Sequence, residues 1–250
     1  MSFNVGSLNR ATTVMSRSFT TAGNDMSRAL ERISSGSRIN RASDDFSGFA
    51  SVVNLSNEAK SFQNRAVQLR EQGAIVEQSL DVANQVLSDL YSMQTALADG
   101  DTQQAAAIGV AIEEALKLQA HDNTNLLSNT LATDLGIRGA TGDALGVSIS
   151  AITGLAAIDG DSDAAAVTAA IGEAQVFVKE LQGLQSAVQS HTALAEVMAS
   201  NSEAVSSAIT SIDEAAEMAK YVEADIRQQA AVSMFSQANM SRRNISMLYR

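Results

Sequence analysis

Apolar and small side chains recur at alternating steps of four and three residues over two long parts of the chain. The first series runs from Leu55 to Leu90, and the second runs from Leu181 to Ala219. This spacing places the side chains on one face of an α-helix, in the heptad pattern of a coiled coil. The sequence therefore predicts one helix over residues 46–98 and a second that begins near Asp163.

Each of these apolar faces is only one side chain wide, so each helix needs a partner to cover it. The two halves of the chain can cover each other, and a shorter helix is expected over residues 102–119, after the sequence ADGD. We therefore predict a mainly α fold, an elongated antiparallel helical bundle or coiled coil of long N- and C-terminal helices. Over about 130–152, glycine and aspartate residues interrupt a short stretch in which apolar and polar residues alternate. This pattern predicts one small β-hairpin, turning at GATGD.

The two ends of the chain carry shorter and less regular apolar stripes at helical spacing. Isolated helices with such thin stripes are marginally stable in water. We expect them to order by packing against other copies of the same chain. The residues predicted to make these subunit–subunit contacts are Phe19, Met26, Leu30, Ile33, Val222, Ile226, Met234, Ile245 and Leu248.

Composition favours slender helices over a wide globule. The 250 residues include no proline, cysteine or tryptophan, and only 4 % are aromatic. Nothing therefore forces a helix to kink, and disulfides and thiolate chemistry are excluded. No apolar run approaches the roughly 18 residues of a membrane span, and the N-terminus has no continuous apolar signal segment. If the protein leaves the cell, we expect a route that cleaves no such peptide.

The net charge of −11 is unevenly distributed. Residues 1–45 hold six arginines and four acids, residues 226–250 hold four arginines and no acid, and the part between them is strongly acidic. Most charge of this kind lies on solvated helix faces. Nucleic-acid binding is not expected, because the whole chain is acidic and no set of stacking aromatics accompanies the arginines.

The sequence has no recognisable catalytic, cofactor or metal site. His121 and His191 stand alone, and we expect His191 to be a packed or hydrogen-bonded residue of a helix seam. The stretch DGDSD, at 159–163, lacks the glycine and distal glutamate of a calcium loop, so its acids are expected to cap the following helix. No serine lies in a Gly-x-Ser-x-Gly turn. The sequence thus predicts a protein that is not an enzyme and needs no cofactor.

Three stretches resemble bacterial flagellin. LERISSGSRINRASDDFSGFA, residues 30–50, is similar to the N-terminal signature of that family. NTNLLSN at 123–129 with LGIRGATGDALGVSI is similar to the region after its second helix, and AAVSMFSQANMSRRNISMLYR resembles its C-terminus. The likeness spans nearly the whole chain with the motifs in the right order. It suggests a short form without the variable outer domains.

The resemblance implies a structural subunit that self-assembles into the bacterial flagellar filament for swimming motility. It implies export by the flagellar type III apparatus, a cytoplasmic chaperone on the C-terminal segment, an extracellular location, and contacts with hook-associated junction and cap proteins. Residues 1–45 with 211–250 would form the inner filament core, and 46–210 the middle bundle. The alternative within the flagellum is the hook–filament junction protein, although RASDD stands where that protein usually has Pro-Ser-Asp-Asp. A soluble coiled-coil adaptor is a further alternative.

In this interpretation, residues 36–45 are a hinge and joint between two helical layers. Gly36 allows backbone conformations that a helix cannot use. Ser43 can cap the next helix, at whose positive end Asp44 and Asp45 are favoured. Arg38 and Arg41 would then be available to bind neighbouring subunits. The other interpretation is an ordinary inter-helix loop whose arginines remain in water.

The chain also departs from the family pattern. Ser241, Arg242 and Arg243 replace the usual proline-containing stretch after Gln-Ala-Asn, and two residues extend past the usual final leucine. The segment that the innate immune flagellin receptor recognises has an Arg-Glu-Leu cluster in the family. Tyr91, Ser92 and Met93 occupy that position here. We therefore expect weak or no activation of the receptor.

Overall fold

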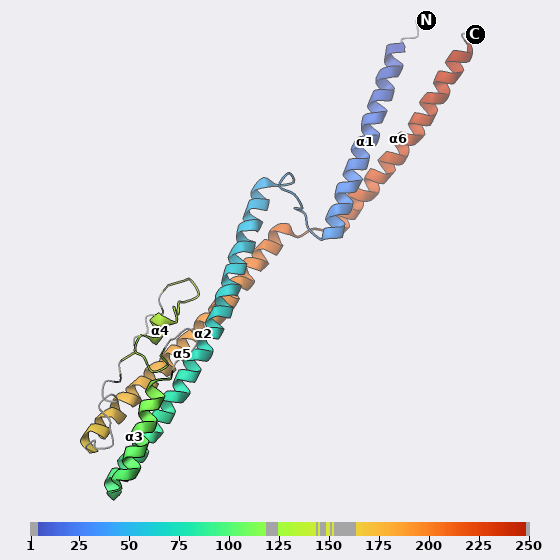
Figure 1. The fold of residues 1–250 in the computed structure, drawn as a ribbon. Helices are drawn as coiled ribbons and strands as arrows, with labels where there is room; N and C mark the ends of the chain where they lie inside the picture. The colour runs from blue at the N-terminus through green and yellow to red at the C-terminus, as the bar shows by residue number, and fades with distance from the viewer. Residues whose placement is uncertain are drawn as a thin grey trace. The chain divides into compact units, whose positions relative to one another are not determined.

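The structure is a computed structural model that describes residues 5–118, 125–143, 145, 149–150, 152 and 164–248. It is mainly α-helical, as predicted (Figure 1). Helix α2 starts at the predicted residue, and α5 starts one residue after Asp163. The helices are α1 (Val5–Ser35), α2 (Phe46–Asp99), α3 (Thr102–Leu116), α4 (Leu131–Asp134), α5 (Ala164–Thr210) and α6 (Glu214–Leu248).

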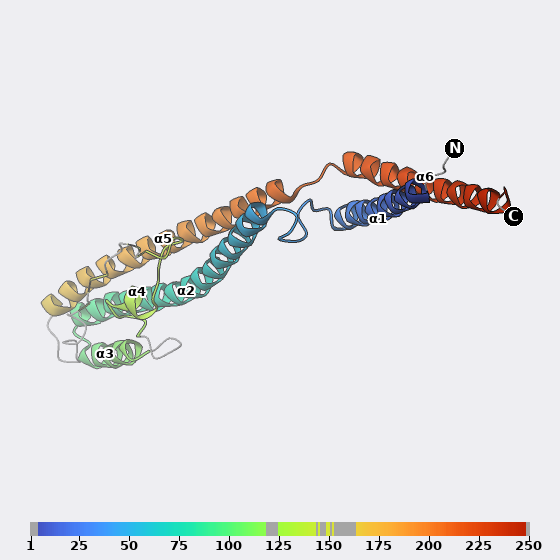
Figure 2. The ribbon, with the colours of Figure 1, turned by 90° about the horizontal axis from the view of Figure 1, so that it is seen from above.

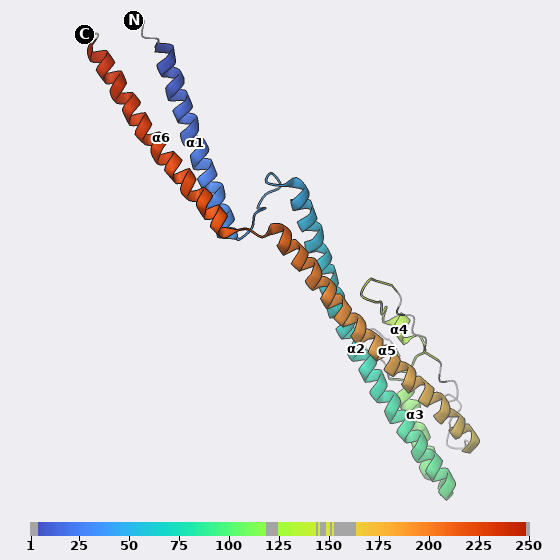
Figure 3. The same cartoon turned by 180° about the vertical axis from the view of Figure 1, so that it is seen from behind.

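The chain forms two compact units. The terminal unit comprises Met1–Ser56 with Glu203–Arg250, and the middle unit comprises Asn57–Ser202. Within the terminal unit, α1 and α6 lie side by side and run in opposite directions (Figures 1 and 3). Segments from the two ends of the sequence therefore meet in one helix pair.

In the middle unit, α2 and α5 lie side by side, and α3 runs along α2 (Figures 1 and 2). The predicted seams are buried where the two helices pack together, since Leu69, Leu90, Leu181 and Leu184 are all inaccessible to solvent. The second series does not continue to Ala219 as predicted, because α5 ends at Thr210 and Val205, Ala216 and Ala219 are exposed. Among the described residues, Phe177 supplies the one large aromatic side chain that is buried in this core. The bundle of long helices is thus confirmed.

A second face of α2 is buried as well, which the single predicted seam did not include. Val86 and Met93 contact the core that also contains Ile112 of α3. Ser79 is fully buried, and its hydroxyl donates a hydrogen bond to the main-chain oxygen of Leu126. Because α3 and the segment after it cover this face, α2 needs two buried stripes in its C-terminal half.

The turn between α2 and α3 follows the predicted ADGD. Gly100 has φ of +77°, in the left-handed region that ends a helix. The Asp101 side chain then accepts a hydrogen bond from the backbone N–H of Gln104 at 3.0 Å and caps α3. The DGDSD segment, predicted to cap α5, lies outside the described residues.

The predicted β-hairpin at about 130–152 is not shown. Its first part is helix α4, and the Ser128 hydroxyl, which accepts from the N–H of Thr130, forms a local turn that competes with strand pairing. The expected turn is present, because the N–H of Gly139 donates to the oxygen of Asp143 at 2.7 Å. No strand flanks it among the described residues of this range, and residues 144, 146–148 and 151 lie outside them.

None of the helices, over the residues described, has an apolar stretch long enough to cross a lipid bilayer.

Candidate functional site

The polar loop, residues 36–45, leaves α1 through a glycine. Gly36 has φ of +65°, and an added Cβ would meet no atom within 4 Å. The conformation alone therefore favours glycine here. Beyond it, Ser37 forms an isolated antiparallel bridge with Ser211, and the N–H of Arg38 donates to the oxygen of Thr210 at 2.7 Å. The loop is thus paired with the segment that joins α5 to α6.

Both arginines of the loop are engaged within the chain. Arg38 donates from Nη2 to the oxygen of Ile209 at 3.1 Å and lies 3.8 Å from a carboxylate oxygen of Asp45. Arg41 donates from Nε and Nη2 to the carboxylate of Glu31, at 3.1 Å and 2.9 Å. In the single chain both side chains are therefore paired, and their predicted contacts with neighbouring subunits stay a prediction.

Asp45, and not Ser43, caps α2. Its carboxylate accepts from the N–H of Gly48 at 2.9 Å, as an N-cap residue directly before Phe46 should. Ser43 is exposed and lies two residues too early for this role. Asp44 instead closes the loop, because its Oδ2 accepts from the N–H of Arg41 at 3.1 Å and also from that of Asn40.

Sequence reasoning missed the packing that holds this cap. Ile39 is buried, and an added Cβ on Gly48 would lie 2.7 Å from its Cδ1 atom. The isoleucine and the Asp45 carboxylate both pack closely on the first turn of α2 at Gly48, so a side chain there would require them to shift. A lone apolar residue in a polar loop, followed by a glycine inside a predicted helix, was the available signal.

The pair of α1 and α6 is held by small side chains. Ala22 and Ala29 of α1 and Ala224 and Ala231 of α6 are buried, each at most 5 % exposed. The predicted stripe on α6 is therefore not the face that meets α1. The large side chains of Leu30, Val222 and Ile226 are exposed and do not belong to this buried seam.

The residues predicted to contact other subunits are mostly accessible. Met26 and Ile33 are half-buried. The side chains of Ile245 and Leu248 lie outside those described, although both residues belong to α6. The predicted contact residues that the structure exposes, with their exposed fractions, are Phe19 (41 %), Leu30 (54 %), Val222 (47 %), Ile226 (60 %) and Met234 (52 %).

A groove of about 910 Å³ runs beside this helix pair. Val14 and Met234 contribute large apolar surface to it, and its lining also includes the arginines Arg10, Arg17 and Arg227. A smaller hollow contains Phe19 together with other residues of α1 and α6. The terminal unit therefore presents apolar surface next to positive charge.

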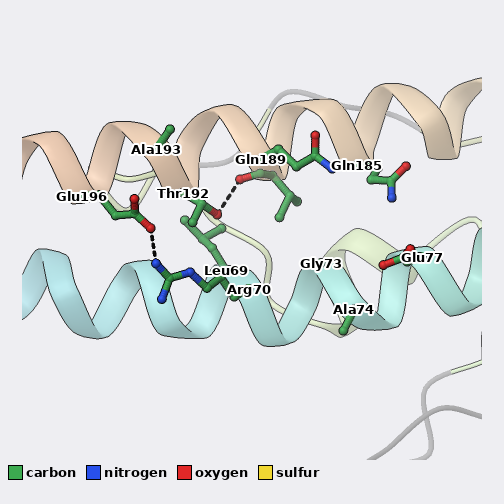
Figure 4. A pocket seen from close by; sticks show the side chains of 11 residues that line it. Leu69, Arg70, Gly73, Ala74, Glu77, Gln185, Gln189, Thr192, Ala193 and Glu196 are labelled. Carbon is green, nitrogen blue, oxygen red and sulfur yellow. Dashed lines mark hydrogen bonds and ion pairs between the residues drawn. The ribbon is translucent and has the colours of Figure 1, made fainter.

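The middle unit has a groove of about 420 Å³ between α2 and α5 (Figure 4). Arg70 and Glu196 point toward each other across it and form an ion pair. At Gly73 the two helices approach closely, since an added Cβ would lie 3.2 Å from Cγ1 of Val188. The lining also includes Leu69, Glu77 and Thr192, and the Thr192 hydroxyl donates to the main-chain oxygen of Val188.

His191 is hydrogen-bonded, as expected for a seam residue. Its Nδ1 accepts from the N–H of Ala140 at 3.3 Å, and Ala140 is buried with Ala66 and Ala195. His191 thus fastens the loop after α4 to α5. Over the described residues, no group of three histidine, aspartate or glutamate side chains could hold a metal ion.

The segment compared with the receptor site is partly buried. Met93 is fully buried, whereas Tyr91 is 44 % exposed and its hydroxyl accepts from Nε2 of Gln175 at 2.6 Å. Ser92 donates back to the oxygen of Ser88 within α2. Only the tyrosine therefore offers a large exposed side chain at this position.

Comparison with known proteins gives one family match. Residues 7–107 match the bacterial flagellin N-terminal helical region. This range includes most of α1, the whole polar loop, α2 and the start of α3. A search of curated proteins found no match.

Proposed function

We propose that the protein is the self-assembling subunit of the flagellar filament, because residues 7–107 match the bacterial flagellin N-terminal helical region. Flagellins are structural proteins of this extracellular filament, and the match supports such a role here. The finer proposal is that the chain polymerises with itself and that the polymer serves swimming motility. In this proposal, the single chain leaves the cell by the flagellar type III route.

One observation carries this proposal. The α1–α6 pair buries alanines, while Leu30, Val222 and Ile226 remain about half exposed or more. Apolar surface removed from water stabilises an assembly by about 25 cal/mol per Å². Contacts among several terminal units can cover these side chains, which no part of α1 or α6 covers in the single chain. Assembly is therefore favoured by the residues that the helix pair leaves outside.

The proposal also assigns positions within the polymer. The terminal helices would form the inner core, the middle bundle would surround them, and residues 36–45 would join the two layers. Arg38 and Asp45 support a joint of defined geometry, because their contacts order the loop in the single chain. Junction and cap proteins, and a cytoplasmic chaperone on the C-terminal segment, are the further partners we expect.

The decisive experiment is electron microscopy of the purified full-length protein after seeding with short filament fragments. Long tubes formed by this chain alone would support the proposal. They would also separate it from a hook–filament junction protein, which should not extend into long filaments by itself. A chain that stays monomeric with seeds at high concentration would contradict the proposal.

Deletion of residues 1–30 or 230–250 separates a filament subunit from a soluble coiled-coil adaptor. The middle unit has its own core, including Leu69, Leu90 and Phe177. We therefore expect the truncated chains to keep that unit helical and to lose assembly. Assembly that survives both deletions would contradict a role for the terminal helices.

We further propose that the protein activates the innate immune flagellin receptor weakly or not at all. Tyr91, Ser92 and Met93 replace the charged cluster that the family presents there, and Met93 is buried. A receptor reporter assay with purified monomer is the measurement. Potency equal to that of a flagellin with the full Arg-Glu-Leu cluster would contradict this proposal.

A further inference from the structure

A histidine of the middle unit contacts the main chain of the turn over residues 138–143. The N–H of Ala140 donates to Nδ1 of His191 on α5 at 3.3 Å. An added Cβ on Gly139 would lie 3.0 Å from Nδ1 and from Cε1 of the same ring, so the imidazole lies directly against the turn. Both turn residues are buried. The contact therefore combines one hydrogen bond with close packing.

The turn keeps its own shape through bonds that do not involve the histidine. The N–H of Gly139 donates to the oxygen of Asp143 at 2.7 Å, and the N–H of Gly142 donates to the oxygen of Gly139 at 2.9 Å. The Thr141 hydroxyl donates to the Asp143 carboxylate at 2.8 Å. Loss of the bond to His191 would therefore weaken the attachment of the turn to α5 and leave the turn itself formed.

The apolar contacts of the turn are small. The methyl group of Ala140 is buried with those of Ala66 and Ala195, in a cluster separate from the main core of the middle unit. Methyl groups bury little apolar surface, so they contribute little to the attachment. Ile137 and Ile149 on either side belong to the main core. Only the turn between them can therefore come away from α5.

The hydrogen bond requires a neutral imidazole. A protonated histidine donates from both ring nitrogens and accepts from neither. Protonation of His191 would therefore place an N–H of the ring against the N–H of Ala140. Histidine is the side chain that commonly changes its charge between pH 5 and 8. The observed contact is thus compatible with the neutral ring and incompatible with the charged one.

The charges around the turn do not compensate for a protonated ring. Among the described residues, the turn itself contains Arg138 and Asp143, and Nη2 of Arg65 on α2 lies 3.9 Å from the position of an added Cβ on Gly142. These three side chains sum to one positive charge. On α5 the charged residue nearest in sequence to the histidine is Glu196, which is paired with Arg70.

We propose that His191 holds the turn of residues 138–143 on α5 while its ring is neutral and releases the turn when the ring is protonated. The attachment is present above the pH range in which the ring titrates and is lost as the pH falls through that range. Release exposes the backbone of Ala140 to solvent. This role belongs to the single chain and does not depend on the proposed function.

Hydrogen exchange of the Ala140 amide tests the proposal in the full-length soluble protein. It is followed by NMR at pH 7.5 and at pH 5.5, and corrected for the intrinsic pH dependence of exchange. We expect the protection factor to fall about fivefold or more, which is the size of effect expected for one hydrogen bond. The fall should follow the titration of the His191 ring protons in the same samples.

The Ser150 amide provides an internal reference, because it donates to the Glu180 carboxylate on the same helix α5. Side-chain carboxylates ordinarily remain ionised over this pH range. Protection of Ser150 should therefore stay constant while that of Ala140 falls.

Three variants separate the acceptor from the ring. H191N keeps a side-chain oxygen that can accept and does not titrate, so Ala140 should be protected at both pH values. H191F keeps an aromatic ring without an acceptor, so Ala140 should exchange rapidly at both. The matched control is H121N, which removes the other histidine of the chain and should preserve the pH dependence.

Three outcomes would overturn the proposal. Protection of Ala140 that is unchanged at pH 5.5, whether or not the ring titrates, would show that the turn is not released. An equal loss of protection at Ser150 would indicate general loosening of the middle unit in acid. A pH dependence that persists in H191N would assign the effect to another group.

Discussion

Arg38 donates a hydrogen bond from Nη2 to the main-chain oxygen of Ile209, across 171 positions of sequence. Its backbone N–H binds the next oxygen, that of Thr210, where α5 ends. The last carbonyls of a helix have no partner within it, and a cation is favoured at that end. Arg38 is therefore the C-terminal cap of α5, supplied from the other end of the chain.

Replacing Arg38 by alanine should fray the last turn of α5. We expect a loss of about 1 kcal/mol in the free energy of unfolding, because the charge-assisted bond is partly exposed. Hydrogen exchange at the last amides of α5, with chemical denaturation of the whole chain, measures the effect. R28A is the control, since Arg28 is also exposed on α1.

The double variant R38A/R41A tests the joint in the assembled state. If residues 36–45 join two layers, filaments should form poorly or bend more easily, as measured by electron microscopy. Filaments of normal yield and stiffness would favour an ordinary loop, even if the single chain is less stable.

Alanine substitution should distinguish the two candidate caps of α2. D45A removes the acceptor for the N–H of Gly48 and should cost about 1 kcal/mol, whereas S43A should change stability by less than about 0.5 kcal/mol. Thermal unfolding followed by circular dichroism measures both. A larger effect for S43A than for D45A would contradict the observed cap.

Two glycines should respond to alanine in opposite directions. G36A forces a side chain into the left-handed region and should cost about 1 kcal/mol, although the site has room for the methyl group. G172A, inside α5 with equal room, should stabilise the protein by about 0.5–1 kcal/mol. Denaturant unfolding of both variants is the measurement. Destabilisation of equal size at both sites would refute the conformational explanation.

Ile226 should matter for assembly and little for the fold of the single chain. I226Q should change the stability of the soluble protein by less than about 0.5 kcal/mol, since the side chain is 60 % exposed. It should raise the critical concentration for polymerisation about tenfold, because an apolar contact would be lost. Seeded light scattering measures this. V110Q, at the 65 % exposed Val110 of α3, is the control and should polymerise normally.

The regular spacing of apolar side chains was sufficient to predict the long helices, because each seam repeats over many turns. Leu69, Leu90, Leu181 and Leu184 all lie where the spacing placed them, and ADGD marks the end of α2. The hairpin was a weaker inference, since short alternation and glycines also fit a helix followed by a turn. There, local side-chain bonds such as that of Ser128 decide the conformation.

The polar loop was identifiable from sequence, but its contacts were not. Gly36 could be assigned an unusual backbone conformation from its residue type alone. The carbonyl that the Arg38 side chain binds lies 171 positions away, and no local pattern points to it. The buried row of α6, with Glu217, Ala224 and Ala231 at seven-residue steps, could also have been noticed. The large apolar residues that define the predicted stripe lie instead on the neighbouring face of α6.

The methyl contacts between α1 and α6 limit how this protein can be engineered. Leucine at heptad positions usually strengthens a coiled coil, but at Ala224 or Ala231 it would wedge the two helices apart, because those sites hold only a methyl group. Thermostable versions should therefore be sought at solvent-facing helix positions such as Gly172 and Gly183, where an added methyl meets no neighbour.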